Sequence, residues 1–156
     1  RSLFFCKGAL ETVKKLGWSP DVVHCHGWFT AMVPLYLKQV YHDDPTFKDV
    51  KGMYSLFNEE ADFGKDTLTS KYAEMAAQED VSAKDAVVYG SGSYADVYKG
   101  ALTYTDIVVK ADEELNADVL KFVEEQNIRT FTPESIDDYE GYSSLYEEFA
   151  SEEVEA

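Results

Sequence analysis

The sequence predicts an α/β fold with a Rossmann-like parallel sheet and flanking helices. Short apolar runs alternate with segments of helical periodicity, and these runs end at glycines or polar loops. Hydrophobic residues make up 45% of the 156 residues, enough for a packed core. Strands that are buried on both faces read as short apolar runs, and crossover helices lie between them. The length suits one domain.

The predicted elements follow one another in a regular order. Strands are expected at residues 21–25, 51–57, 106–109 and 129–131. Helices are expected from Leu3 to Leu16 and at residues 30–41, 65–78, 93–102, 116–126 and 133–148, with a short helical turn at 82–85. Gly17 ends the first helix, Pro34 falls in or near the first turn of the second, and Asn116 caps a later helix.

The charge of the chain excludes two classes of partner. The formal net charge is -16, whereas nucleic acids and anionic membrane surfaces are bound by clustered Lys and Arg. The sequence therefore predicts no nucleic-acid partner and no membrane partner. Residues 147–156 carry five Glu and are expected to form an acidic tail, either a solvated helix end or frayed chain.

The two cysteines, Cys6 and Cys25, both lie in apolar segments. Two cysteines in a chain of this length do not make a disulfide framework, so we expect reduced, buried thiols and a cytoplasmic setting. No apolar run approaches the roughly 20 residues that span a bilayer. The helical pattern is already under way at Arg1 with no N-cap before it, which predicts a piece of a longer chain.

The segment His24 to Trp28 is the predicted ligand-facing point. In open parallel sheets, ligands bind at the carboxyl ends of strands, and strand alternation places His24 and His26 on the same side. Gly27 permits the turn, and the N–H groups of the following helix suit a phosphate or a hydroxyl group. A histidine at a strand end is equally often a hydrogen-bonded core residue, and this second reading stays open for His24. A zinc site is not expected, because Cys25 points to the opposite face and His42 is isolated.

The stretch from Trp18 to Lys38 resembles the bacterial glycogen and starch synthases. Those enzymes read P-D, two hydrophobic residues, then H-x-H-D-W-H, where this chain has Pro20 to Phe29. The helix before this stretch is also similar, and Tyr54 to Asn58 stands where the family reads T-I-H-N. Residues 106–110 are loosely similar to a further strand of the family.

The resemblance implies a retaining glycosyltransferase of two Rossmann-like domains, of which this chain is the second half of the first. The donor would be ADP-glucose, the acceptor an α-1,4-glucan, and no metal or other cofactor would be required. The substrate-binding positions that the resemblance implies are His24, His26, Gly27, Trp28, Thr30 and Asn58. An incomplete domain would expose an apolar sheet edge, so homo-oligomers are expected.

Two departures from the family pattern bear on catalysis. The histidine that contacts the transferred glucose in the family is Phe29 here, and the histidine of H-N is Phe57. A phenyl ring neither donates nor accepts a hydrogen bond of that kind, and losing one oriented polar group costs roughly 10²–10³ in rate. We therefore leave the catalytic residues unassigned and expect this chain alone to be inactive. The alternative is a non-catalytic glucan-binding or regulatory relative, with Trp28, Tyr36 and Tyr54 as sugar-stacking rings.

A glycine-rich segment offers a third reading. Residues 90–100 mimic a kinase glycine loop, and Lys110 falls at a plausible distance for a phosphate-binding lysine. Ala95 replaces the third glycine, and the 46 residues after Lys110 are too few for a kinase catalytic lobe. A dinucleotide loop lacks a clearly placed acidic partner. The segment is expected to be an ordinary loop before a helix, and a kinase-like nucleotide binder is the least favoured function.

Overall fold

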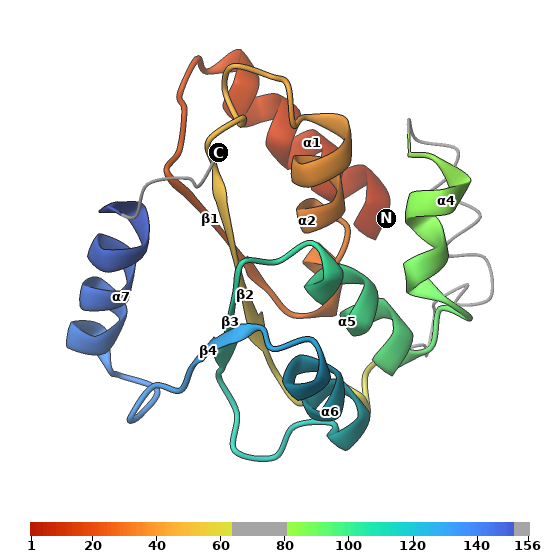
Figure 1. Cartoon of the computed structure of the whole chain (residues 1–156), viewed down its shortest axis with the longest axis vertical. Coiled ribbons are helices and arrows are strands. Elements are labelled where there is room, and N and C mark those ends of the chain that lie inside the picture. Colours follow the sequence, from red (N-terminus) through yellow and green to blue (C-terminus); the bar gives the residue numbers. More distant parts are fainter. Residues whose placement is uncertain (64–80, 152–156) are drawn as a thin grey trace.

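The computed structural model of the protein describes residues 1–63 and 81–151, and its centre is a parallel sheet (Figure 1). Its described strands are β1 (Val22–His26), β2 (Lys51–Leu56), β3 (Ile107–Lys110) and β4 (Arg129–Phe131). They lie in the order β1-β2-β3-β4, and each neighbouring pair is parallel. The predicted α/β class and parallel sheet are confirmed, and each strand begins and ends within one residue of its prediction.

Helices cover both faces of this sheet. They are α1 (Ser2–Lys15), α2 (Val33–Leu35), α4 (Ala83–Ala86), α5 (Tyr94–Thr103), α6 (Ala117–Glu125) and α7 (Tyr139–Ser151). The shorter turns are the 3-10 segments η1 (Trp28–Thr30) and η4 (Val87–Tyr89) and the π-helical segment η2 (Tyr36–Val40). Figure 1 shows α7 by itself on one side of the sheet, with α1, α2, α5 and α6 on the other.

Side-chain caps fix where two of these helices begin. The Ser93 hydroxyl accepts from the Asp96 N–H at the start of α5. The Asn116 side-chain oxygen accepts from the N–H groups of Asp118 and Val119 at the start of α6. Such caps satisfy donors that have no partner within the helix. The cap predicted at Asn116 is confirmed.

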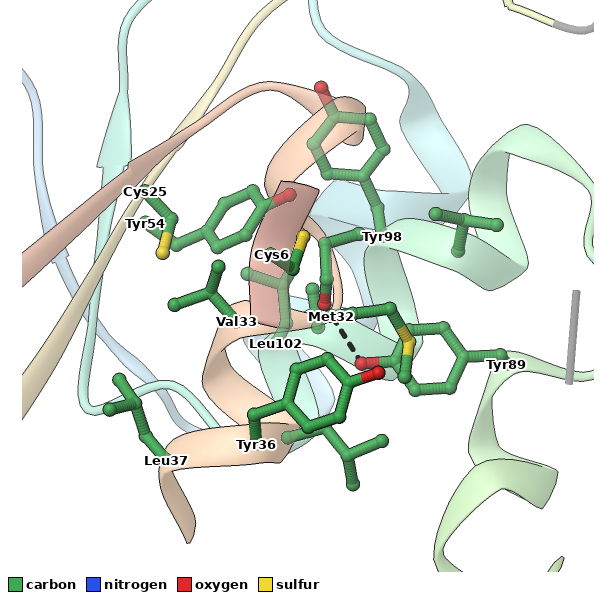
Figure 2. Close-up of a cluster of buried hydrophobic side chains, with 14 of the residues drawn as sticks. Cys6, Cys25, Met32, Val33, Tyr36, Leu37, Tyr54, Tyr89, Tyr98 and Leu102 are labelled. Atoms are coloured by element: carbon green, nitrogen blue, oxygen red, sulfur yellow. Dashed lines mark hydrogen bonds between the residues drawn. The ribbon is translucent and has the colours of Figure 1, made fainter. Parts of the chain in front are cut away.

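The alternation of β2 divides the core into two clusters. Tyr54 and Leu56 face the larger cluster, under α1, α2, α5 and α6, whereas Met53 faces the smaller one under α7. Figure 2 shows the larger cluster, where the rings of Tyr54, Tyr89 and Tyr98 gather among aliphatic and sulfur-containing side chains. The Tyr89 hydroxyl donates to the Ala31 carbonyl at 2.8 Å, so this buried polar group is satisfied.

Cys6 and Cys25 are both buried free thiols in the larger cluster, as predicted. Burial raises the pKa of Cys6 to about 11. Burial also raises the pKa of Cys25, and the nearby Cys6 raises it further. Since the thiolate is the reactive form, both side chains behave as inert core residues.

Two predicted helices differ from the structure. Residues 30–41 do not form one helix but a series of 3-10, α and π turns, in which the Tyr41 N–H reaches back to the Tyr36 carbonyl. The helix predicted at 133–148 begins only at Tyr139, because the Asp138 carboxylate accepts from the N–H groups of Glu134 and Gly141 and closes a turn first.

Three further predictions concern a helix, the acidic tail and membrane spans. The helix predicted at 65–78 lies outside the described residues. Residues 147–151 of the predicted acidic tail form the last turn of α7, with Glu147 and Glu148 exposed. No helix within residues 1–63 and 81–151 is long and apolar enough to cross a membrane.

Candidate functional site

The carboxyl end of β1 brings two imidazole rings together. His24 and His26 lie on one face of the strand, with ring centroids 4.1 Å apart. Cys25, between them, points to the opposite face and is buried in the larger cluster. The predicted shared side of the two histidines is confirmed, and it follows from the two-residue period of a strand.

His24 is held by hydrogen bonds at both ring nitrogens. Its Nε2 lies 2.8 Å from the Ser55 hydroxyl on β2, and its Nδ1 lies 2.5 Å from the Tyr146 hydroxyl on α7. Burial, and to a smaller extent the neighbouring His26, lowers the pKa of His24 to about 3. The ring is therefore neutral at physiological pH, with one nitrogen donating and the other accepting. These contacts favour the structural reading of His24; its role in substrate binding stays a prediction.

His26 is the more accessible ring of the pair. It is exposed at the rim of the sheet, and the Phe57 ring, just past the end of β2, lies 6.1 Å away between centroids. Partial burial lowers the pKa of His26 as well. A neutral imidazole at a strand end can donate to or accept from a hydroxyl group, which is the chemistry that a sugar presents.

Gly27 makes the turn after β1 in a conformation that favours glycine, with φ of 68°. A Cβ atom at this position would lie 2.5 and 2.8 Å from the two carboxylate oxygens of Glu59. The Glu59 carboxylate accepts from the Trp28 N–H at 3.1 Å and from the Tyr98 hydroxyl at 2.9 Å. The Trp28 N–H, which we expected to be available to a ligand, is therefore satisfied within the protein.

Sequence reasoning missed Glu59 for a physical reason. It lies in a polar loop after β2, where no periodicity assigns a direction to its side chain. Tyr94 orders this loop: its hydroxyl donates to the Phe57 carbonyl at 2.6 Å and accepts from the Glu59 N–H at 3.2 Å. Only the loop conformation brings residues 27 and 59 together.

Aromatic side chains surround the turn. Trp28 is half-buried and packs edge-on against Phe63, with centroids 5.2 Å apart. Phe29 is 38% exposed, and its ring lies 5.3 Å from that of Phe5. The Thr30 hydroxyl lies 3.0 Å from the carbonyls of His26 and Gly27, so it closes the turn rather than pointing into solvent.

Tyr36 and Tyr54 cannot be sugar-stacking rings. Each is 0% exposed, and the Tyr54 hydroxyl donates to the Gly27 carbonyl at 2.6 Å. Stacking on a sugar requires an accessible ring face, so the proposal of stacking by these two side chains is wrong. Their sequence positions on a predicted strand and helix did not show that both faces of those elements are covered.

Asn58 lies two residues past the end of β2 and directly follows Phe57, which lines a cleft. Its N–H donates to the Asp112 carboxylate at 2.7 Å, and its side chain is exposed. The cleft encloses about 160 Å³ that is partly open to solvent, and its lining residues are Leu56, Phe57, Tyr94, Tyr98, Leu115, Asn116 and Val119. Only about 10 Å³ of it is wide enough for a water molecule, which is room for about one water, so the cleft is too small to hold a sugar.

The glycine-rich segment is a loop before a helix, as predicted. Gly90 and Gly92 adopt positive φ after η4, and the Asp96 carboxylate accepts from both the N–H and the hydroxyl of Ser91. A kinase glycine loop joins two strands, and a dinucleotide loop directly follows a strand. Here a 3-10 turn precedes the loop, so both nucleotide-binding readings are wrong.

Within residues 1–63 and 81–151, no group of three or more His, Cys, Asp or Glu side chains is arranged to hold a metal ion. His42 is apart from the other two histidines: its Nε2 lies 2.9 Å from the Asp43 carboxylate and its Nδ1 lies 3.2 Å from the Gln39 carbonyl.

A family model described as the starch synthase catalytic domain matches residues 1–130. The chain belongs to this family. The match takes in all of β1, β2 and β3 and the turn that holds His24 to Thr30, so the chain is a glycogen/starch synthase-like glycosyltransferase domain. Helix α7, which starts at Tyr139, lies beyond the matched residues.

Curated relatives agree with the family match. The chain is 40% identical over 80 residues to a glycogen synthase of Chlorobium luteolum, which covers 51% of this chain and 16% of that protein. It is 33% identical over 115 residues to a glycogen synthase of Clostridium perfringens, covering 72% of this chain and 23% of that protein. The matched region is thus less than a quarter of these relatives' length. No solved structure matches significantly.

Proposed function

We propose that this chain is part of the N-terminal domain of a glucan synthase that transfers glucose from ADP-glucose to an α-1,4-glucan. The family match and the glycogen synthase relatives support this proposal. The β1 turn would face the substrates, since ligands of open parallel sheets bind where the strands end. Substrate contacts would come from His26, the turn at Gly27 and Trp28, and Asn58, with His24 behind them.

The observation that bears on activity is the phenyl ring of Phe29 in the turn after β1. Phe29 stands where the resemblance implies the histidine that contacts the transferred glucose, and its ring is partly exposed beside Phe5. A phenyl ring cannot form that hydrogen bond. We therefore propose that this chain alone does not transfer glucose.

Transfer of labelled glucose from ADP-glucose to glycogen tests this directly. We expect no incorporation by the full chain above a blank without protein. Phe29→His should also give none, because Phe57 still replaces the second histidine of the family pattern. Turnover by the unmodified chain would overturn our reading of Phe29.

A second candidate function is glucan binding without catalysis. It is favoured by the partly exposed rings of Phe29 and Phe5, since exposed aromatic faces pack against the apolar faces of sugars. Affinity electrophoresis in a glycogen gel would test it: retardation is expected and should be lost in Phe29→Ala. The matched control is Leu16→Ala, an exposed apolar residue next to the end of α1 that should leave retardation unchanged. Migration unaffected by glycogen would count against glucan binding.

We also propose a setting for the protein. The net charge of -16 supports the absence of nucleic-acid and anionic membrane partners, and the two free thiols support a cytoplasmic location. Donor and acceptor binding would need no metal. In the part of the chain that the structure describes, β1 pairs on one side only, with β2, which supports homo-oligomers formed through its other edge. Light scattering on the eluting protein would detect them.

A further inference from the structure

Helix α7 covers the face of the sheet that carries the two histidines of β1 (Figure 1). Leu145 and Phe149 of α7 pack against Met53, Ile107 and Val109. The Tyr146 hydroxyl is hydrogen-bonded to Nδ1 of His24, and the centroids of the Tyr142 and His24 rings are 6.4 Å apart. The helix therefore occupies the side from which a ligand would approach His24.

Helix α7 buries far fewer of its residues than α5 does. Of its 13 residues only Leu145 and Phe149 are buried, whereas the ten-residue α5 buries six. Its last turn holds Glu147 and Glu148 and no basic residue, and negative charge there opposes the helix dipole. Elements with few buried apolar contacts open at the lowest cost in free energy.

Polar contacts hold α7 at separate points. Near its end, the Lys51 ammonium donates to the Phe149 carbonyl at 2.7 Å, and Arg129 pairs with Glu148 at 2.8 Å. In its middle, Tyr146 bonds to His24. These polar contacts form only when α7 lies in its docked position, so they define that position. They bury little apolar surface, so they add only modestly to the stability of docking.

We propose that α7 is a displaceable internal latch: docked, it withholds the His24 imidazole from ligands, and undocked, it presents His24 beside His26 at the end of β1. The inference goes beyond the proposed function and does not depend on it, because it concerns access to an imidazole rather than glucose transfer. Undocking would also uncover Met53 and Ile107, so the open form is the minor one.

Carbethoxylation of histidines with diethyl pyrocarbonate, followed by mass spectrometry, tests the latch. The chain has three histidines, so each rate can be measured separately. We expect His42 to react fastest, His26 next and His24 slowest. Tyr146→Phe should speed the reaction of His24 roughly three- to tenfold, the value of one hydrogen bond, and leave His42 unchanged. Tyr139→Phe, a 75% exposed tyrosine of the same helix, is the matched control and should change nothing.

A second variant separates displacement of the helix from local shielding. Lys51→Met removes the bond to the Phe149 carbonyl at the far end of α7 and should also speed the reaction of His24. If only Tyr146→Phe does so, the latch is refuted in favour of local shielding. Hydrogen exchange of the unmodified protein gives a further test: α7 amides should exchange at least tenfold faster than α5 amides, and equal rates would refute the latch.

Discussion

Acidification should destabilise the protein through His24. In the folded chain, burial lowers the pKa of this imidazole to about 3, whereas in the unfolded chain it titrates near 6.5. Between these values the unfolded chain takes up a proton that the folded chain does not. Stability contributed by neutral His24 is therefore complete above about pH 6.5 and falls as the pH drops towards about 3.

The size of this loss in the free energy of unfolding follows from the gap between the two pKa values of His24. Each pH unit inside it lowers the free energy of unfolding by about 1.4 kcal/mol. From about pH 6.5 to about pH 5 the loss is therefore about 2 kcal/mol. This is a large share of the roughly 5–15 kcal/mol that stabilises an ordinary domain. Protonation also forces the hydroxyl that donates to His24 to turn and accept instead, since an imidazolium ring can only donate.

Urea unfolding followed by tryptophan fluorescence measures this effect, because Trp28 is half-buried against Phe63. The control variant is His24→Gln, which has no imidazole to titrate but keeps a polar group on the Ser55 side. The difference in free energy of unfolding between the two proteins should shrink by about 2 kcal/mol over the interval. Parallel loss of stability in both proteins would show that folded His24 accepts a proton and would refute the reasoning.

Further substitutions test the packing, a buried hydrogen bond and a helix cap. Gly100→Ala places a Cβ atom 2.5 Å from the Tyr89 ring and should lower the free energy of unfolding by about 1–3 kcal/mol in the same urea assay. Gly8→Ala, whose Cβ atom would have nothing within 4 Å, should instead raise it by about 0.5–1 kcal/mol, because alanine favours the helical conformation of α1. Tyr54→Phe leaves the buried Gly27 carbonyl without this donor and should cost about 1–2 kcal/mol, and an unchanged midpoint would contradict the bond. Asn116→Ala removes the cap of α6 and should cost about 1 kcal/mol, with Asn116→Asp retaining most of the stability.

The elements that could be predicted are those set by local periodicity. The apolar run of β1 and its flanking glycine predicted a strand, and the two-residue period placed His24 and His26 together. The cap at Asn116 followed from its position before an apolar helix. In each case, the signal lies within a few residues of the feature.

The features that could not be predicted depend on distant parts of the chain. Glu59 meets Gly27 only through a loop conformation that no spacing specifies. Tyr146 reaches His24 across 122 positions of sequence. The late start of α7 reflects competition by the Asp138 side chain, which offers the backbone a turn in place of a helix. Tertiary contacts and side-chain capping decided these three cases.

The sequential order of the strands has a kinetic consequence. Among the described strands, each pairs with the one before it in the chain, so the growing sheet offers a formed edge to the next strand that leaves the ribosome. Docking of α7 is different, because its partner His24 belongs to the earliest strand and the closed loop spans most of the chain. Closing so long a loop costs the most entropy, so we expect the seating of α7 to be the final step of folding.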